Sequence, residues 1–236
     1  EAARLNHRLL AAELGALGIT VDSAPVLDLP RAGAHDVIGD RAFAGDPVVV
    51  AALGRAACEG LLAGGVLPVV KHVPGHGRAR ADSHKELPTV DASRAEMEAT
   101  DFAPFQSLHD APWAMTAHVL YTALDRDHPA TQSARVIEGV IRGHMGFDGV
   151  LVSDDLGMNA LKGDFRSRAE ASLRAGCDVV LHCGGDGGEM RLVAEGAATL
   201  APAALRRVAA AEARRRQGIE PFETAGARAR LDILLA

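Results

Sequence analysis

Short apolar runs alternate with longer segments of helical periodicity along this chain of 236 residues. Five runs are predicted to form β-strands, over 19–27, 66–70, 113–117, 149–152 and 178–181. Helical periodicity predicts helices over 5–17, 47–63, 92–108, 133–145, 165–175, 189–200 and 202–217. Because the strands are continuously apolar, they are typical of a parallel sheet covered by helices. The sequence therefore predicts an α/β fold.

The helix over 47–63 has the clearest boundaries. Asp46 precedes Pro47, which pairs an N-cap residue with a proline at the first helical position. Gly64 and Gly65 end the helical pattern. We therefore expect both ends of this helix to be fixed by local sequence.

The composition excludes several classes of protein. A formal net charge of −6 leaves no basic stripe for a polynucleotide, so we expect no nucleic-acid partner. No apolar run approaches the roughly 18 residues of a membrane span, so we expect no membrane insertion. With 48% hydrophobic residues, the chain can bury one core, and we expect a single domain over 1–236.

The three cysteines give no disulfide framework. Cys177 and Cys183 flank a strand-like run whose six residues span roughly 20 Å when extended, which is too far for a bridge. The odd count indicates a reducing compartment. With no signal sequence before the first helix, we expect the protein to be cytoplasmic.

Polar side chains come directly after several predicted strands. They are Lys71, His72, His118, Asp154 and His182. Active sites of (β/α) barrels and open α/β sheets lie at the carboxyl edge of the strands. The loop 71–84 alone carries one lysine, three histidines and one aspartate. We therefore expect this edge of the sheet to carry the active site.

Asp82 and His84 are two residues apart, so in an extended segment they would project to the same side. A carboxylate beside an imidazole fixes its tautomer and raises its basicity, which suits a general acid/base. Taken alone, the pair is equally consistent with incidental charges on a surface loop.

Asp154 ends a predicted strand and is followed by Asp155. An ionised aspartate at this edge suits a nucleophile that attacks the anomeric carbon of a sugar. One of the two carboxylates is expected near the site and the other is expected to point away or to cap the next segment. For an isolated Asp-Asp pair, capping alone is the more frequent role.

A metal site is the competing interpretation of the histidines. His72 and His76 have the i, i+4 spacing of zinc-binding helices. Pro74 and Gly75 lie between them and prevent that helix. We therefore expect no metal and no other cofactor.

Taken together, these stretches resemble glycoside hydrolase family 3, in its bacterial β-N-acetylglucosaminidase branch. The resemblance rests on residues 71–77 with 82–84, on 153–158, and on 24–28, 38–43 and 117–119, in the family's order. It covers nearly the whole chain. It implies a TIM-type (β/α)8 barrel that is incomplete here: about the last five βα units are present, and the first three have no counterpart. From the strand count alone, a complete but smaller open sheet is the alternative.

The resemblance implies a role for each site residue. Asp154 would be the nucleophile, and His84 would be the general acid/base with Asp82 as its orienting partner. The sugar hydroxyls and N-acetyl group would be held by Arg41, Lys71 and His72.

The implied activity is the removal of terminal non-reducing N-acetyl-β-glucosamine from peptidoglycan-derived anhydro-muropeptides, by retaining double displacement, during cell-wall recycling. The partner would be a small saccharide, and the protein a monomer. Two alternatives remain open. One is a non-catalytic α/β remnant that binds sugar, and the other is a related family 3 exo-glycosidase or phosphorylase.

Overall fold

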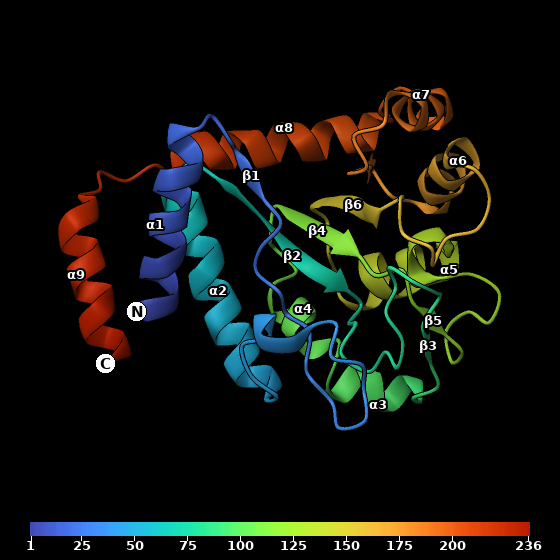
Figure 1. Ribbon diagram of the computed structural model, residues 1–236, viewed down its shortest axis with the longest axis horizontal. Helices are drawn as coiled ribbons and strands as arrows, with labels where there is room; N and C mark the ends of the chain where they lie inside the picture. The colour runs from blue at the N-terminus through green and yellow to red at the C-terminus, as the bar shows by residue number, and fades with distance from the viewer.

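The computed structural model describes residues 1–236, and five parallel strands form its central sheet (Figure 1). The strands lie in the order β1-β2-β4-β6-β7. Their bounds are Val21–Asp22 for β1, Leu67–Val73 for β2, Trp113–Thr116 for β4, Val150–Asp155 for β6 and Val179–Leu181 for β7. The five predicted strands and their parallel arrangement are therefore confirmed.

Two strands differ in length from their prediction. Only Val21–Asp22 of the expected run 19–27 pairs regularly, although Pro25 and Leu27 still bond to the backbone of Lys71. The strand β2 runs on to Val73, because its backbone finds partners on both sides beyond the predicted end. Lys71 and His72 thus lie inside β2, and the prediction that they follow the strand was wrong.

Three predicted helices have the expected bounds, namely α2 Pro47–Ala63, α6 Phe165–Ala175 and α8 Pro202–Gln217. The side chain of Asp46 accepts hydrogen bonds from the backbone of Val48 at 2.7 Å and Val49 at 3.3 Å, which confirms the predicted cap. The remaining helices are α1 Ala2–Ala16, α3 Arg94–Ala99, α4 Ala103–Ser107, α5 Ala134–Val136, α7 Gly187–Gly196 and α9 Thr224–Leu235. The 3₁₀ turns η1 Gly39–Arg41 and η2 Ala130–Gln132 and the π-helical segment η3 Ile137–His144 complete the set.

The single helix expected over 92–108 is two short helices, α3 and α4. Pro104 has no N–H to donate to the carbonyl of Thr100, so the helical ladder cannot continue across this point. The sequence did not predict the last helix or a small second sheet. The tail forms α9, which the side chain of Glu223 caps, and a two-stranded sheet joins β3 Thr89–Val90 to β5 Leu120–Tyr121.

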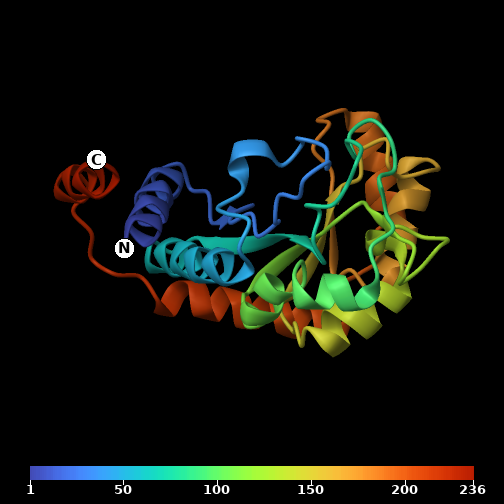
Figure 2. The ribbon, with the colours of Figure 1, turned by 90° about the horizontal axis from the view of Figure 1, so that it is seen from below.

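Residues on the two faces of the sheet pack against different partners. Val70, Ala114 and Leu151 belong to the main core with α2 and α4, as alternation along the strands requires. Val69 and Met115 face the other way, in a small cluster of their own. Figure 2 shows the loop that carries η1 and the loop after β2 on one side of the sheet, with α3 and α4 on the other.

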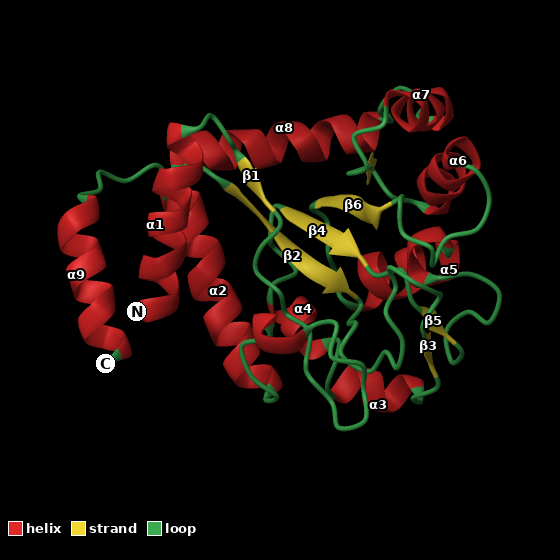
Figure 3. Cartoon of the chain, in the orientation of Figure 1, coloured by secondary structure: helices red, strands yellow, loops and turns green.

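The two ends of the sheet also differ. The helix α8 lies across the amino ends of the strands, where Arg207 binds Asp148 and Arg215 bonds to the carbonyl of Gly65. Loops gather at the carboxyl ends, toward which the strand arrows point (Figure 3). The fold therefore leaves the carboxyl edge of the sheet to the loops.

Both chain termini lie beside each other on α1 and α9 (Figure 1).

No helix combines the length and the apolar character that crossing a bilayer would require. Cys58 and Cys177 are buried, Cys183 is exposed, and all three are free thiols.

Candidate active site

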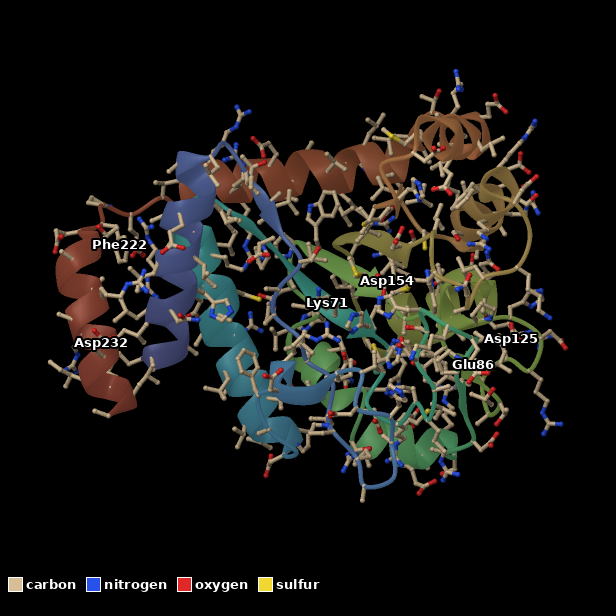
Figure 4. The ribbon with its side chains drawn as sticks, viewed as in Figure 1. Lys71, Glu86, Asp125, Asp154, Phe222 and Asp232 are labelled. Atoms are coloured by element: carbon tan, nitrogen blue, oxygen red, sulfur yellow. The ribbon has the colours of Figure 1, made fainter.

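Five of the six predicted site residues line one cavity of about 160 Å³ at the carboxyl edge of the sheet. They are Arg41, Lys71, His72, His84 and Asp154. Figure 4 shows Lys71 and Asp154 close to each other, at the carboxyl ends of β2 and β6. The sixth residue, Asp82, lies behind His84 and bonds to it.

The side chains of Asp154 and Asp155 point in different directions, as the sequence predicted. The side chain of Asp154 is nearly buried and its Oδ2 lies 3.9 Å from Nε2 of His72. Asp155 instead accepts hydrogen bonds from the backbone of Gly157 at 2.9 Å and Cys183 at 3.0 Å. Oδ1 of Asp154 accepts from the backbone of Asp155 at 2.8 Å, and of the two carboxylates only that of Asp154 lines the cavity.

His72 is fixed by a buried carboxylate that sequence reasoning missed. Nδ1 of His72 lies 2.6 Å from Oδ2 of Asp28, a residue that is 1% exposed. An ionised carboxylate can only accept, so Nδ1 carries a proton and Nε2 is left to face Asp154. Two signals in the sequence pointed to it: Asp28 directly follows a predicted strand, and it ends the stretch 24–28 that resembles the family.

Asp28 holds the loop as well as the ring. Its carboxylate also accepts hydrogen bonds from the backbone N–H groups of His72 and His76, the latter at 2.6 Å. Burial acts to raise the pKa of Asp28, but the charges and hydrogen bonds of the two histidines outweigh it and the pKa lies below its usual value. The carboxylate therefore stays ionised and keeps both histidines in place.

The Asp82–His84 pair forms, but not in the extended segment that the prediction assumed. The chain turns at this point, and Oδ1 of Asp82 accepts from both the backbone N–H of His84 at 3.0 Å and its Nδ1 at 2.8 Å. These hydrogen bonds lower the pKa of Asp82. The ring of His84 is 60% exposed, so it lies at the mouth of the cavity with Nε2 unbonded.

The two cationic residues lie on different walls. Burial lowers the pKa of the Lys71 amine, against the opposing attraction of Asp154. The Arg41 guanidinium bonds to the carbonyls of Val37 at 2.6 Å and Ile38 at 3.2 Å, which sets its direction from η1. Both residues thus bring hydrogen-bond donors to the wall of a partly buried cavity.

His118 and His182, which also follow strands, do not line this cavity. His118 is buried, with Nδ1 2.7 Å from Oγ1 of Thr131 and Nε2 3.0 Å from the carbonyl of Asp155. Burial lowers its pKa. Both ring nitrogens of His118 have hydrogen-bond partners in the protein, so His118 supports the end of β6 and does not enter the cavity. The ring of His182 instead faces Glu189 of α7.

Two further polar residues of the cavity wall, His76 and Ser83, were not predicted. His76 is buried, its ring centroid lies 5.6 Å from that of His72, and burial lowers its pKa. Its Nε2 lies 3.3 Å from Oγ of Ser83. No group of three or more histidine, cysteine or acidic side chains is arranged to hold a metal ion.

Residues 2–212 match the sequence model of the Glycosyl hydrolase family 3 N terminal domain. The chain belongs to glycosyl hydrolase family 3. The family expected from the motifs is therefore confirmed, and the match takes in every residue of the cavity.

Curated family 3 relatives are β-hexosaminidases. That of Tolumonas auensis is 45% identical over 190 residues, which are 78% of this chain and 56% of the relative. That of Aromatoleum aromaticum is 41% identical over 226 residues, which are 94% of this chain and 63% of the relative. The chain thus spans somewhat more than half the length of these relatives.

Solved family 3 structures share the fold. NagZ from Neisseria gonorrhoeae, in complex with N-trifluoroacetyl-D-glucosamine, is 34% identical with a TM-score of 0.83, over 100% of this chain and 70% of NagZ. A β-N-acetylglucosaminidase from Paenibacillus is 34% identical with a TM-score of 0.84, over 95% of this chain and 46% of that protein. The parallel sheet is therefore a partial barrel of the predicted type.

Proposed function

We propose that the full-length protein is a retaining β-N-acetylglucosaminidase that removes terminal non-reducing N-acetyl-β-glucosamine. The observation that carries this proposal is that Asp154 and His84 line one cavity together with Arg41, Lys71 and His72. The names of the family relatives support the same sugar specificity.

In the first step, a carboxylate oxygen of Asp154 attacks the anomeric carbon, and the bond from that carbon to the leaving-group oxygen breaks. His84 gives its Nε2 proton to this oxygen, while Asp82 holds the Nδ1 proton. The product is a glycosyl ester of Asp154. An imidazole suits this role beside a carboxylate nucleophile, because it adds no second negative charge to the site.

In the second step, His84 takes a proton from water, and the water oxygen attacks the anomeric carbon. The bond from the sugar to Asp154 breaks, and the sugar leaves with its β configuration retained. The exposed position of His84 gives water access to the ring.

The remaining residues hold the sugar. Arg41 and Lys71 offer hydrogen-bond donors to its hydroxyls and N-acetyl carbonyl. His72, fixed by Asp28, presents Nε2 beside Asp154, where it can bond to a hydroxyl that flanks the reacting carbon.

We also propose that the natural substrates are peptidoglycan-derived anhydro-muropeptides, hydrolysed by a monomeric enzyme in the cytoplasm. The chain would form part of one catalytic domain, since five parallel strands are present where a closed barrel has eight. Its share of the relatives' length, 56% and 63%, supports this division.

The test is hydrolysis of an aryl N-acetyl-β-glucosaminide by the full-length protein. Asp154→Ala should abolish release of the aryl group, because no nucleophile remains. His84→Ala should lower turnover about 10²- to 10⁴-fold, the usual worth of general acid/base catalysis. Asp148→Ala, at a carboxylate outside the cavity with 85% exposure, is the matched control and should retain full activity. Unchanged turnover in Asp154→Ala would reject the proposal.

The same assay separates the alternatives. Sugar binding at equilibrium without turnover at high protein concentration would identify a binding module instead. A sugar 1-phosphate formed on addition of inorganic phosphate would identify a phosphorylase.

A further inference from the structure

The turn that carries His84 is fastened to the segment that follows the proposed nucleophile. Nδ2 of Asn159 donates to the carbonyl of His84 at 3.0 Å, and the backbone N–H of Asn159 reaches the same oxygen at 3.4 Å. The backbone N–H of Ala160 donates to the carbonyl of Ser83 at 3.2 Å. This segment begins only a few residues after Asp154. The two proposed reacting groups are therefore joined by a short path.

Few other hydrogen bonds hold this turn. Within residues 82–86, the bonds of Asp82 and the backbone bonds of Lys85 and Glu86 are internal. The only other outside contact of this kind is that of Ser83 Oγ with His76. The position of the turn therefore depends mainly on its bonds to Asn159 and Ala160, since the exposed ring of His84 bonds only to Asp82 within the turn.

Asn159 itself is free for this task. It is exposed, its Nδ2 has no acceptor other than the carbonyl of His84, and it does not line the cavity. Its removal would take one donor from the turn and leave Asp154 and the cavity walls unchanged. A role in folding or in sugar binding would need contacts that Asn159 does not make.

We infer that Asn159 is a positioning residue, which holds the acid/base His84 across the cavity from Asp154. This inference rests on the proposed function. The bond from Nδ2 fixes the turn in the form that points Nε2 at the leaving-group oxygen. When this hydrogen bond is lost, the turn spends part of the time in other conformations, and proton transfer from His84 slows.

The choice of leaving group distinguishes a role in positioning His84 from a general effect on activity. A 2,4-dinitrophenyl N-acetyl-β-glucosaminide needs no proton to leave, whereas a phenyl glycoside does. In the full-length protein, Asn159→Ala should lower kcat/KM for the phenyl glycoside about 10- to 100-fold, the scale of a small misplacement. It should leave kcat/KM for the dinitrophenyl glycoside nearly unchanged. Asn159→Gln, which keeps an amide donor, should restore part of the loss.

Lys162→Ala is the matched control, because this exposed residue lies on the same segment and bonds to nothing in the site. It should leave both substrates unaffected. An equal loss with both substrates in Asn159→Ala, or no loss with either, would overturn the inference.

A second measurement does not depend on activity. Trypsin should cleave after Lys85 faster in Asn159→Ala than in the parent protein or in Lys162→Ala, because the turn is released. Equal cleavage rates would overturn the inference. If the parent hydrolyses neither glycoside, or if Asp154→Ala remains active, the proposed function fails, and the cleavage rates alone decide whether Asn159 holds the turn.

Discussion

Asp28 shows how one buried side chain can order several parts of a site. It accepts hydrogen bonds from the ring of His72 and from the backbone of His72 and His76. A carboxylate with three donors is stabilised as an anion, which explains why its pKa lies below the usual value despite burial. Its contribution to stability must therefore depend on pH.

The direction of this dependence follows from the lowered pKa. The contribution of Asp28 is fully present above the ordinary carboxyl pKa of 3.8 and is lost as the pH falls through the lower pKa of the folded state. Asp28→Asn should therefore destabilise the full-length protein more at pH 7 than at pH 3, as measured by urea unfolding at both values. Asp36→Asn, at an exposed aspartate, should show no such difference. An equal loss at both pH values would contradict this account.

At the scale of the element, the loop after β2 packs backbone to backbone against the segment that follows β1. A Cβ placed on Gly77 would collide with the backbone carbonyl of Leu29. The glycine is needed here because of this close approach and not because of its dihedral angles. The contact keeps Asp28 within reach of His72 and His76.

Gly77→Ala should therefore separate the two segments and destabilise the protein by about 1–3 kcal/mol, the usual cost of overpacking. It should also weaken the proposed binding of N-acetylglucosamine, because Asp28 would move away from His72 and His76. Thermal unfolding and equilibrium binding measure the two effects. Gly15→Ala is the control, since a Cβ there meets open space in α1 and should stabilise by roughly 0.5–1 kcal/mol. A Gly77→Ala protein as stable as its parent would show that the loops can shift freely.

At the scale of the whole molecule, Asp178 connects elements from several parts of the chain. This nearly buried carboxylate precedes β7 and accepts from Arg142 of η3 at 2.8 Å, from Arg207 of α8 at 2.9 Å and from the backbone of Leu151 in β6 at 2.9 Å. The network lies at the amino end of the sheet, opposite the cavity. It fixes α8 without entering the site.

Asp178→Ala should destabilise the full-length protein by about 3 kcal/mol, because the largely buried Arg142 loses its counter-ion. The value lies at the lower end of the usual range, since Arg142 keeps the carbonyls of Phe147 and Gly149 as acceptors. Asp148→Ala removes an exposed partner of Arg207 and should cost under about 1 kcal/mol. Urea unfolding of both variants makes the comparison, and equal losses would contradict the network's importance.

Local sequence was enough for elements whose ends are set by their own residues. The ends of α2 follow from Asp46, Pro47 and the two glycines after Ala63. Local sequence was not enough where hydrogen bonds to distant segments set the end of an element. The strand β2 extends past Val70 because the neighbouring segments offer hydrogen-bond partners. The short sheet of β3 and β5 escaped prediction because two residues a strand leave no periodic pattern.

The sequence by itself determined the parallel sheet and the edge at which Arg41, Lys71, His72, His84 and Asp154 line one cavity. These depend on periodicity and on motifs that short stretches contain. Only the tertiary structure decided which side chains hold them. Asp28 is 44 residues from His72, and Asn159 is 75 residues from His84. Hydrogen bonds across such separations depend on the path of the folded chain, which no local pattern specifies.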